Sequence, residues 1–225
     1  MRRWLYRMQY KYGRYGIDNL MLYIAVTMLA VFLAEMLLPV PATSFLAFSR
    51  SLILEGQVWR VLTFIFIPMP THPLFLLVSL AVYYFLGRSL EDQWGRFSFT
   101  LYYVFGIIGA IIAGFLTGSV SNYYLNLSLL LAFASLFPNA EFRLFFLIPV
   151  KVKYIGYVLW IFYALALIIA LISLNLAAVA ALIASLANFF LFFGEELLER
   201  FRNWKKYRSR RQQFRRDKNR YNDRW

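Results

Sequence analysis

Residues 154–193 read YIGYVLWIFYALALIIALISLNLAAVAALIASLANFFLFF, and these 40 residues decide the class of fold. As a single helix they would extend about 60 Å at about 1.5 Å per residue, roughly twice the hydrocarbon thickness of a bilayer. The chain must therefore reverse direction inside the stretch, and Ser173-Leu174-Asn175 is the segment that favours a turn. The stretch predicts two membrane-spanning helices joined by a tight turn.

The rest of the chain agrees with a membrane environment. Of its 225 residues 61% are hydrophobic and 20% aromatic, and its mean hydropathy is +0.58. These values exceed those of soluble domains, and no Gly/Ser/Pro-rich linker divides the chain. We predict an all-α membrane protein, a six-helix bundle over residues 20–195, between a basic segment 1–19 and a basic tail 196–225. The six apolar runs are 20–38, 74–86, 97–116, 123–137, 154–174 and 176–193.

The positions of Lys and Arg predict the orientation. If both ends of the chain are cytoplasmic, the segments on that side hold 22 of the 24 basic residues, and only Arg50 and Arg60 lie on the other side. Membrane proteins carry this excess of basic residues in their cytoplasmic loops. We therefore expect a multi-pass protein of a cell membrane, bacterial by our reading, with both termini cytoplasmic.

Two of the apolar runs are short for a membrane span. Residues 74–86 and 123–137 would make helices of about 20 to 23 Å, against a hydrocarbon core of about 30 Å. One interpretation is that longer neighbours surround short helices and the bilayer thins around the protein. The alternative is that residues 87–93 continue the second helix into the interface.

The segment between the first two runs, residues 39–73, is too apolar for an ordinary external loop. Irregular backbone at membrane depth persists only when it packs on protein or faces water, so we expect a structured, half-submerged loop. Trp59 suits the boundary between water and hydrocarbon, and Arg60 can donate to several carbonyls or to a carboxylate. Taken singly, either residue could also be an ordinary interfacial aromatic or a snorkelling cation.

Four motifs occur in order along the predicted spans. Together they resemble the rhomboid superfamily, although each motif alone is weak. They are GQVWRVLT at 56–63, GRSLEDQWG at 87–95, GIIGA at 106–110, and LFPNAEF at 136–142 followed by FLIPV at 146–150.

The resemblance implies a six-helix bundle whose membrane-embedded first loop carries Trp59 and Arg60. In that frame Glu91 accepts hydrogen bonds at the cytoplasmic end of the second helix, and Gly95 permits the reversal into the third helix. Gly106 and Gly109 belong to a small-residue stripe on the third helix, where close helix contact is expected.

Catalytic rhomboids resemble one another in a Gly-x-Ser-Gly motif on the fourth helix and a histidine on the sixth, because a serine hydroxyl needs a base. Neither is present here. The fourth helix has no glycine, and Ser185 stands near the position of the histidine. Phe75 and Ser79 take the approximate positions of the histidine and asparagine that the family has on its second helix. His72, the only histidine, is interpreted as an interfacial loop residue.

The expected function is therefore that of a catalytically inactive rhomboid-like protein, as in derlins, which also pair Trp-Arg with Leu-Glu. It would bind transmembrane segments of client proteins. Two alternatives remain: a divergent intramembrane serine protease that uses a hydroxyl such as that of Ser128, and a small-solute transporter. No cofactor or metal motif is found in this cysteine-free chain. The candidate client cleft comprises Phe75, Tyr123, Ser128, Ser185 and Asn188.

The basic tail has 12 Lys and Arg residues from Arg200 to Arg224. A segment of this kind next to a span binds anionic lipid headgroups, at about 1 kcal/mol per basic residue near the surface. Nucleic acid is a less favoured partner, because nothing in the tail resembles a nucleic-acid-binding module. The residues assigned to lipid contact are Arg208, Arg210, Arg211, Arg215 and Arg216.

Overall fold

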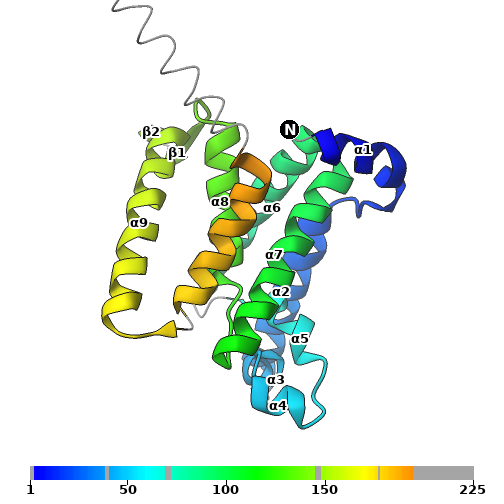
Figure 1. Ribbon diagram of the computed structural model, residues 1–225, viewed down its shortest axis with the longest axis vertical. Helices are drawn as coiled ribbons and strands as arrows, with labels where there is room; N and C mark the ends of the chain where they lie inside the picture. The colour runs from blue at the N-terminus through cyan, green and yellow to red at the C-terminus, as the bar shows by residue number, and fades with distance from the viewer. Residues whose placement is uncertain (1–2, 39–40, 69–71, 145–147, 177, 195–225) are drawn as a thin grey trace, which may run out of the picture.

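The computed structural model describes residues 3–38, 41–68, 72–144, 148–176 and 178–194. Over these residues the protein is predominantly helical (Figure 1). Four helices are long and apolar enough to cross a membrane: α2 (Leu20–Leu37), α6 (Pro73–Trp94), α7 (Arg96–Thr117) and α9 (Val152–Ile172). Two apolar helices are shorter, α8 (Tyr123–Leu136) and the orange helix of Figure 1 (Ala178–Gly194), hereafter the final helix. The class of fold expected from the sequence is confirmed at this level.

The two helices that the sequence analysis described as short, α6 and α8, differ in length. α6 has 22 residues and continues through Gly87 to Trp94, so of the two open interpretations the structure supports the one in which residues 87–93 continue the second helix. The polar residues that follow Leu86 still favour helix, and the helix ends where Gly95 takes a φ of 82°. α8 is short as expected, because its 14 residues extend about 21 Å.

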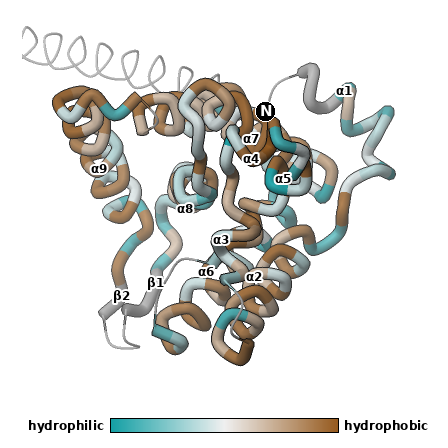
Figure 2. The backbone as a smooth tube through the Cα atoms, turned by 90° about the horizontal axis from the view of Figure 1, so that it is seen from below, coloured by the Kyte–Doolittle hydropathy of each residue, from teal (hydrophilic) through white to brown (hydrophobic). Residues whose placement is uncertain are grey.

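α8 lies in the middle of the bundle. Its buried residues occupy all sides of the helix, and a helix that is apolar all round is buried on all sides. Its neighbours include α6, α7 and α9, and Figure 2, seen along the bundle, shows it between them. The buried residues of α8 are Leu125, Asn126, Ser128, Leu129, Leu131, Ala132, Phe133 and Ala134.

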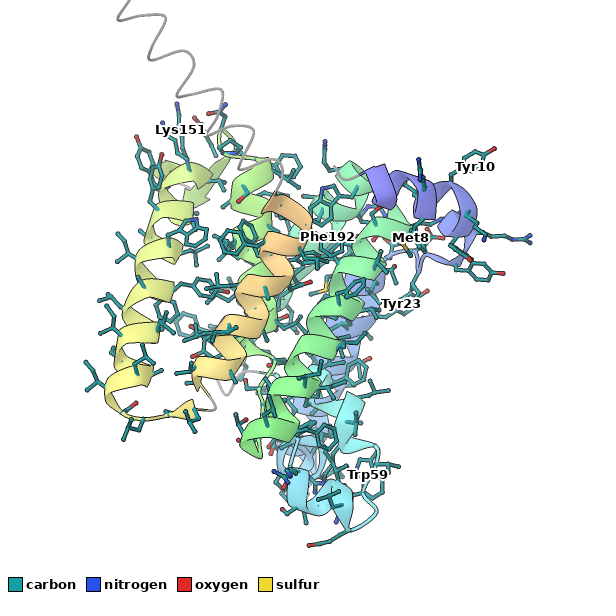
Figure 3. The ribbon with its side chains drawn as sticks, in the orientation of Figure 1. Met8, Tyr10, Tyr23, Trp59, Lys151 and Phe192 are labelled. Carbon is teal, nitrogen blue, oxygen red and sulfur yellow. The ribbon has the colours of Figure 1, made fainter. Side chains whose placement is uncertain are left out.

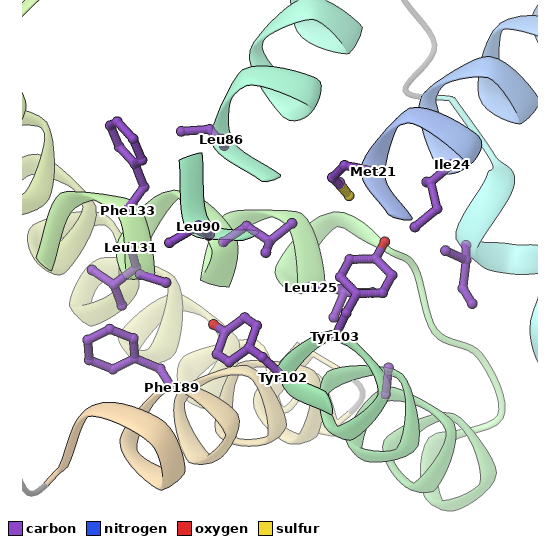
Figure 4. Close-up of a cluster of buried hydrophobic side chains, with 14 of the residues drawn as sticks. Met21, Ile24, Leu86, Leu90, Tyr102, Tyr103, Leu125, Leu131, Phe133 and Phe189 are labelled. Carbon is purple, nitrogen blue, oxygen red and sulfur yellow. The ribbon is translucent and has the colours of Figure 1, made fainter. Parts of the chain in front are cut away.

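Each of the surrounding helices buries one stripe of side chains along a single face. On α2 this stripe is Met21, Ile24, Ala25 and Met28, at the spacing that places side chains on one face. The opposite faces carry many exposed large apolar side chains, which suits a lipid solvent. Figure 4 shows how the stripes meet, with Leu86 and Leu90 of α6, Tyr102 and Tyr103 of α7, and Phe133 of α8 in one cluster.

The two ends of the bundle carry different elements (Figure 1). One end holds the loop helices α3 (Ala42–Leu46), α4 (Arg50–Leu54), α5 (Arg60–Thr63) and the 3-10 turn η2 (Phe64–Phe66). The other end holds α1 (Arg3–Tyr12), η1 (Gly13–Tyr15) and two strands, β1 (Glu141–Leu144) and β2 (Ile148–Lys151).

The strands form an antiparallel hairpin in the register Glu141↔Lys151 and Leu144↔Ile148. The sequence analysis predicted neither this hairpin nor α1. Both elements lie outside the long apolar runs, and hydropathy alone does not predict secondary structure in such segments.

The turn expected between the last two helices is present. Ser173 ends α9, and Leu174 adopts a left-handed conformation with a φ of 51°. The side chain of Asn175 accepts a hydrogen bond from the backbone N–H of Ala178 at 3.0 Å, which caps the start of the final helix.

Candidate functional site

Arg60 holds together the loop formed by residues 41–68. Its side chain is only 5% exposed, and it donates from one terminal nitrogen to the backbone oxygens of Ser44 and Ala47, both at 2.7 Å. Its Nε donates to the Oε1 of Gln57 at 2.6 Å. The guanidinium therefore satisfies carbonyls that the short helices of the loop leave unpaired.

Trp59 covers this arrangement from outside. Its ring stacks on that of Phe45 with centroids 6.0 Å apart, and its indole N–H donates to the backbone oxygen of Phe45 at 3.4 Å. The same Phe45 ring lies 5.8 Å from the guanidinium carbon of Arg60. Trp59 remains 43% exposed, at the end of the bundle opposite α1 (Figure 3).

Polar contacts also fasten the loop to α2, to the end of α7 and to the start of α8. Thr43 donates to Glu35 of α2 at 2.6 Å, and the backbone N–H of Arg50 donates to the carbonyl of Gly118 at the end of α7 at 2.9 Å. Asn122, just before α8, donates from its Nδ2 to the carbonyls of Ile65 at 2.9 Å and Ile67 at 2.8 Å. The sequence analysis did not single out Asn122, although an Asn before a helix is a common capping signal.

Glu91 and Gly95 act at the other end of the bundle. Glu91 is 6% exposed, and its Oε1 accepts from the backbone N–H of Asn19, the residue that precedes α2. Gly95 has a φ of 82°, which residues with a Cβ rarely adopt, and it joins α6 directly to α7. Glu91 therefore fixes the start of α2 beside the turn that Gly95 makes.

Gly106 and Gly109 on α7 differ in how tightly they are packed. A Cβ at Gly106 would overlap the side chain of Leu125 on α8 and would lie 3.0 Å from Nδ2 of Asn188 on the final helix. A Cβ at Gly109 would meet the Cβ of Ala184 at 3.5 Å, an ordinary contact. Gly106 is therefore a position where α7, α8 and the final helix approach closely.

Ser185 joins three helices through one hydroxyl. It donates to the backbone oxygen of Tyr124 on α8 at 2.8 Å, so its single proton is used there. The hydroxyl of Tyr163 on α9 lies 2.7 Å away and must then be the donor to Ser185. Sequence reasoning missed Tyr163, because an isolated tyrosine in an apolar run carries no pattern.

Ser128 is also committed to a structural hydrogen bond. Its hydroxyl donates to the carbonyl of Leu125 in its own helix at 2.7 Å, and its backbone oxygen accepts from the hydroxyl of Tyr102 at 3.1 Å. A serine nucleophile needs a base to take its proton, and the partner here is a carbonyl oxygen.

Ser128, Ser185 and Asn188 line one small cavity with Gly106. Its volume is about 10 Å³, enough for a single water molecule. The Nδ2 of Asn188 donates to the carbonyl of Tyr102 at 3.3 Å, while its buried Oδ1 has no hydrogen-bond partner among the described residues. Three of the five residues assigned to the client cleft thus share one site.

A larger groove lies on the other side of Asn188. It has a volume of about 220 Å³ between α7 and the final helix. Its lining is apolar apart from the Asn188 amide, and it comprises Phe105, Ile108, Gly109, Ile112, Ala184, Ala187, Asn188 and Leu191.

Phe75 and Tyr123 do not line either space. Phe75 is 69% exposed near the start of α6, where its ring contacts that of His72 at 6.4 Å. Tyr123 contacts Phe162 of α9 at 6.3 Å. The Nδ1 of His72 accepts from the backbone N–H of Leu74 at 3.4 Å, so the histidine caps α6.

Arg208, Arg210, Arg211, Arg215 and Arg216 lie outside the described residues, so their assignment to lipid contact stays a prediction. Within the described ranges, no three His, Asp or Glu side chains come together as metal ligands.

No family model matches the chain, and no curated protein matches it.

Proposed function

We propose that this chain is a six-span, rhomboid-like membrane protein without protease activity, which binds transmembrane segments of client proteins. α8 and the final helix, at about 21 and 26 Å, would complete the six spans together with the four longer helices. The cytoplasmic face would be the end that carries α1 and the hairpin, because Arg7, Lys11, Lys151 and Lys153 lie there.

The observation that carries the client-binding proposal is the groove beside Asn188. Apolar side chains line it, its volume is about 220 Å³, and it opens between two helices in the membrane region. Asn188 is the polar residue of this lining, so a polar side chain on an incoming helix would find a hydrogen-bonding group beside the groove. Alanine at 184 and 187 and Gly109 would let the backbone of that helix approach closely.

The short central helix supports the same proposal. α8 falls about 9 Å short of a hydrocarbon core of about 30 Å, which favours local thinning of the bilayer around the protein. Polar residues in a client helix cost less free energy in a thinned bilayer than in one of full thickness. Client helices that carry such residues would therefore gather near the groove.

The proposal of inactivity rests on the two serines. Ser128 and Ser185 donate their hydroxyl protons to carbonyl oxygens at 2.7 and 2.8 Å. A divergent protease would require Ser128 or another hydroxyl as its nucleophile. We expect a transmembrane reporter to remain uncut by the wild-type chain and equally by Ser128→Ala and Ser185→Ala, as measured by electrophoresis. Cleavage that either substitution abolishes would favour the protease instead.

Photo-crosslinking in native membranes tests client binding. The crosslinker is placed at Ile112, which lines the groove and is 56% exposed, and in a matched control at Ile169 of α9, which is 64% exposed and lies outside the groove. We expect adducts with helical membrane proteins from position 112 and lipid adducts from position 169. Lipid adducts alone at both positions would contradict client binding.

The tail has its own test. A peptide of residues 200–225 should bind anionic liposomes, and added salt should weaken the binding. Absence of binding at low salt would exclude the lipid assignment of Arg208, Arg210, Arg211, Arg215 and Arg216.

A further inference from the structure

α1 is held in a defined place at one end of the bundle. Gln9 donates from its Nε2 to the backbone oxygen of Trp94 at 3.4 Å and accepts from the hydroxyl of Ser98 at 3.4 Å. These two residues lie on either side of the turn between α6 and α7. Figure 1 shows α1 extending sideways from this turn, away from the membrane-spanning helices. The position of α1 is therefore set by protein contacts.

The segment that connects α1 to α2 is fixed as well. Asp18 forms an ion pair with Arg96 at 2.9 Å, and the backbone N–H of Ile17 donates to the hydroxyl of Thr100 at 3.1 Å. Both partners lie in the first turns of α7. This connection holds α1 at the level where α7 begins, which is the boundary of the apolar span.

The two sides of α1 differ in chemistry. Met8 and Gln9 are half-buried, and Figure 3 shows Met8 facing the bundle while Tyr10 points away from it. Tyr10 is 96% exposed, and Arg7 and Lys11, four positions apart, are exposed on the same side. Arg14 in η1 continues this basic face. The result is an amphipathic helix at the edge of an apolar bundle.

Among the described residues, no acidic side chain balances the charge of this face. The first acidic residue of the sequence is Asp18, and it pairs with Arg96. Arg7, Lys11 and Arg14 form no ion pair with any described carboxylate. Tyr12 and Tyr15, exposed by 40% and 76%, add the aromatic rings that are common at the level of lipid headgroups.

We propose that the basic face of α1 and η1, formed by Arg7, Lys11 and Arg14, is a binding site for anionic lipid headgroups. The guanidinium and ammonium groups would donate charge-assisted hydrogen bonds to lipid phosphates, while Met8 contacts the bundle and the apolar part of the interface. The residues of this site differ from those assigned to the tail and from those that line the client groove.

A label at position 10 gives a local readout, because the chain has no cysteine. Full-length Tyr10→Cys protein in detergent micelles carries an environment-sensitive fluorophore and is titrated with short-chain phosphatidylglycerol. We expect a saturable change in fluorescence with phosphatidylglycerol and none with short-chain phosphatidylcholine. An equal response to both lipids would overturn the proposal, and so would the same response to inorganic phosphate, because the site would then bind small anions.

Two double variants locate the site. Each removes two positive charges, and both pairs lie at the same end of the bundle. Arg7→Gln with Lys11→Gln should weaken phosphatidylglycerol binding about 30-fold, since each basic residue near an anionic surface contributes roughly fivefold. Lys151→Gln with Lys153→Gln should change it less than about twofold. Arg7→Lys with Lys11→Arg should bind like the parent. Equal weakening by both Gln pairs would show a general charge effect and would refute the site.

Discussion

The loop of residues 41–68 contains only short helical segments, yet hydrogen bonds connect it to α2, α7 and the start of α8. α9 is a regular helix of 21 residues, yet in mid-span it is tied to its neighbours by the Tyr163–Ser185 hydrogen bond and otherwise by apolar contacts. Regular secondary structure satisfies its own backbone, so α9 needs few external partners, whereas irregular backbone at membrane depth needs many. The two regions should therefore respond differently to the loss of single side chains.

The largest effect is expected at Arg60. In Arg60→Ala the carbonyls of Ser44 and Ala47 lose their donor, and buried polar groups left unpaired cost about 1–3 kcal/mol each. We expect a loss of about 3 kcal/mol in unfolding free energy, measured by titration with SDS in mixed micelles. The matched control is Arg50→Ala in the same loop, where the side chain is exposed and little change is expected. Equal losses in the two variants would contradict the anchoring role of Arg60.

Asn122→Ala should have the next largest effect. The change removes one amide that donates to two loop carbonyls, those of Ile65 and Ile67. We expect a loss of about 2 kcal/mol and faster proteolysis of the loop in the folded protein. Asn175→Ala is the control, because its side chain caps the final helix and does not touch the loop. It should lower stability without increasing cleavage in the loop.

Substitution at Gly106 tests how tightly α7 packs against α8. Gly106→Ala should be about 1–2 kcal/mol less stable than Gly109→Ala, because only the Cβ at 106 overlaps Leu125. The two variants gain the same helix propensity, so their difference isolates the packing effect. Equal stability in the SDS titration would show that α7 and α8 separate easily at this point.

The smallest effect is expected from Tyr163→Phe, which removes the donor to Ser185. Hydrogen bonds between membrane helices average about 0.6 kcal/mol, so the global stability should change little. Hydrogen exchange of the α9 backbone should nevertheless increase, while exchange in α5 stays constant. If exchange in α5 rose by the same factor, the loop and α9 would behave as one cooperative unit.

The sequence was sufficient for the positions of the helices that lie in long apolar runs. The bounds of α2, α7 and α9 fall within two residues of the apolar runs, since burial in lipid or protein requires the same side chains. It was not sufficient for the length of α6, because polar residues after Leu86 continue a helix as readily as they start a loop. Hydropathy also carries no signal for the β-hairpin or for the docking of α1.

The candidate site was predictable where a residue type restricts the geometry. Arg60 and Gly95 are such residues, since a buried guanidinium needs carbonyls and a positive φ favours glycine. Asn122, Tyr163 and Gln9 were missed because their partners lie at least 22 residues away in the sequence. Contacts of this kind depend on how the helices pack, and a single sequence does not display that packing.

The bond between Asn122 and Ile65 spans 57 residues of sequence, which has a consequence for synthesis of the protein. At roughly 5–20 residues per second, the ribosome takes about 3–11 s to add the intervening chain. During that interval the loop has left the ribosome but lacks its partner Asn122 at the start of α8. The nascent loop, with its apolar residues Phe64 and Ile65, must then be shielded by lipid or by the insertion machinery until α8 arrives.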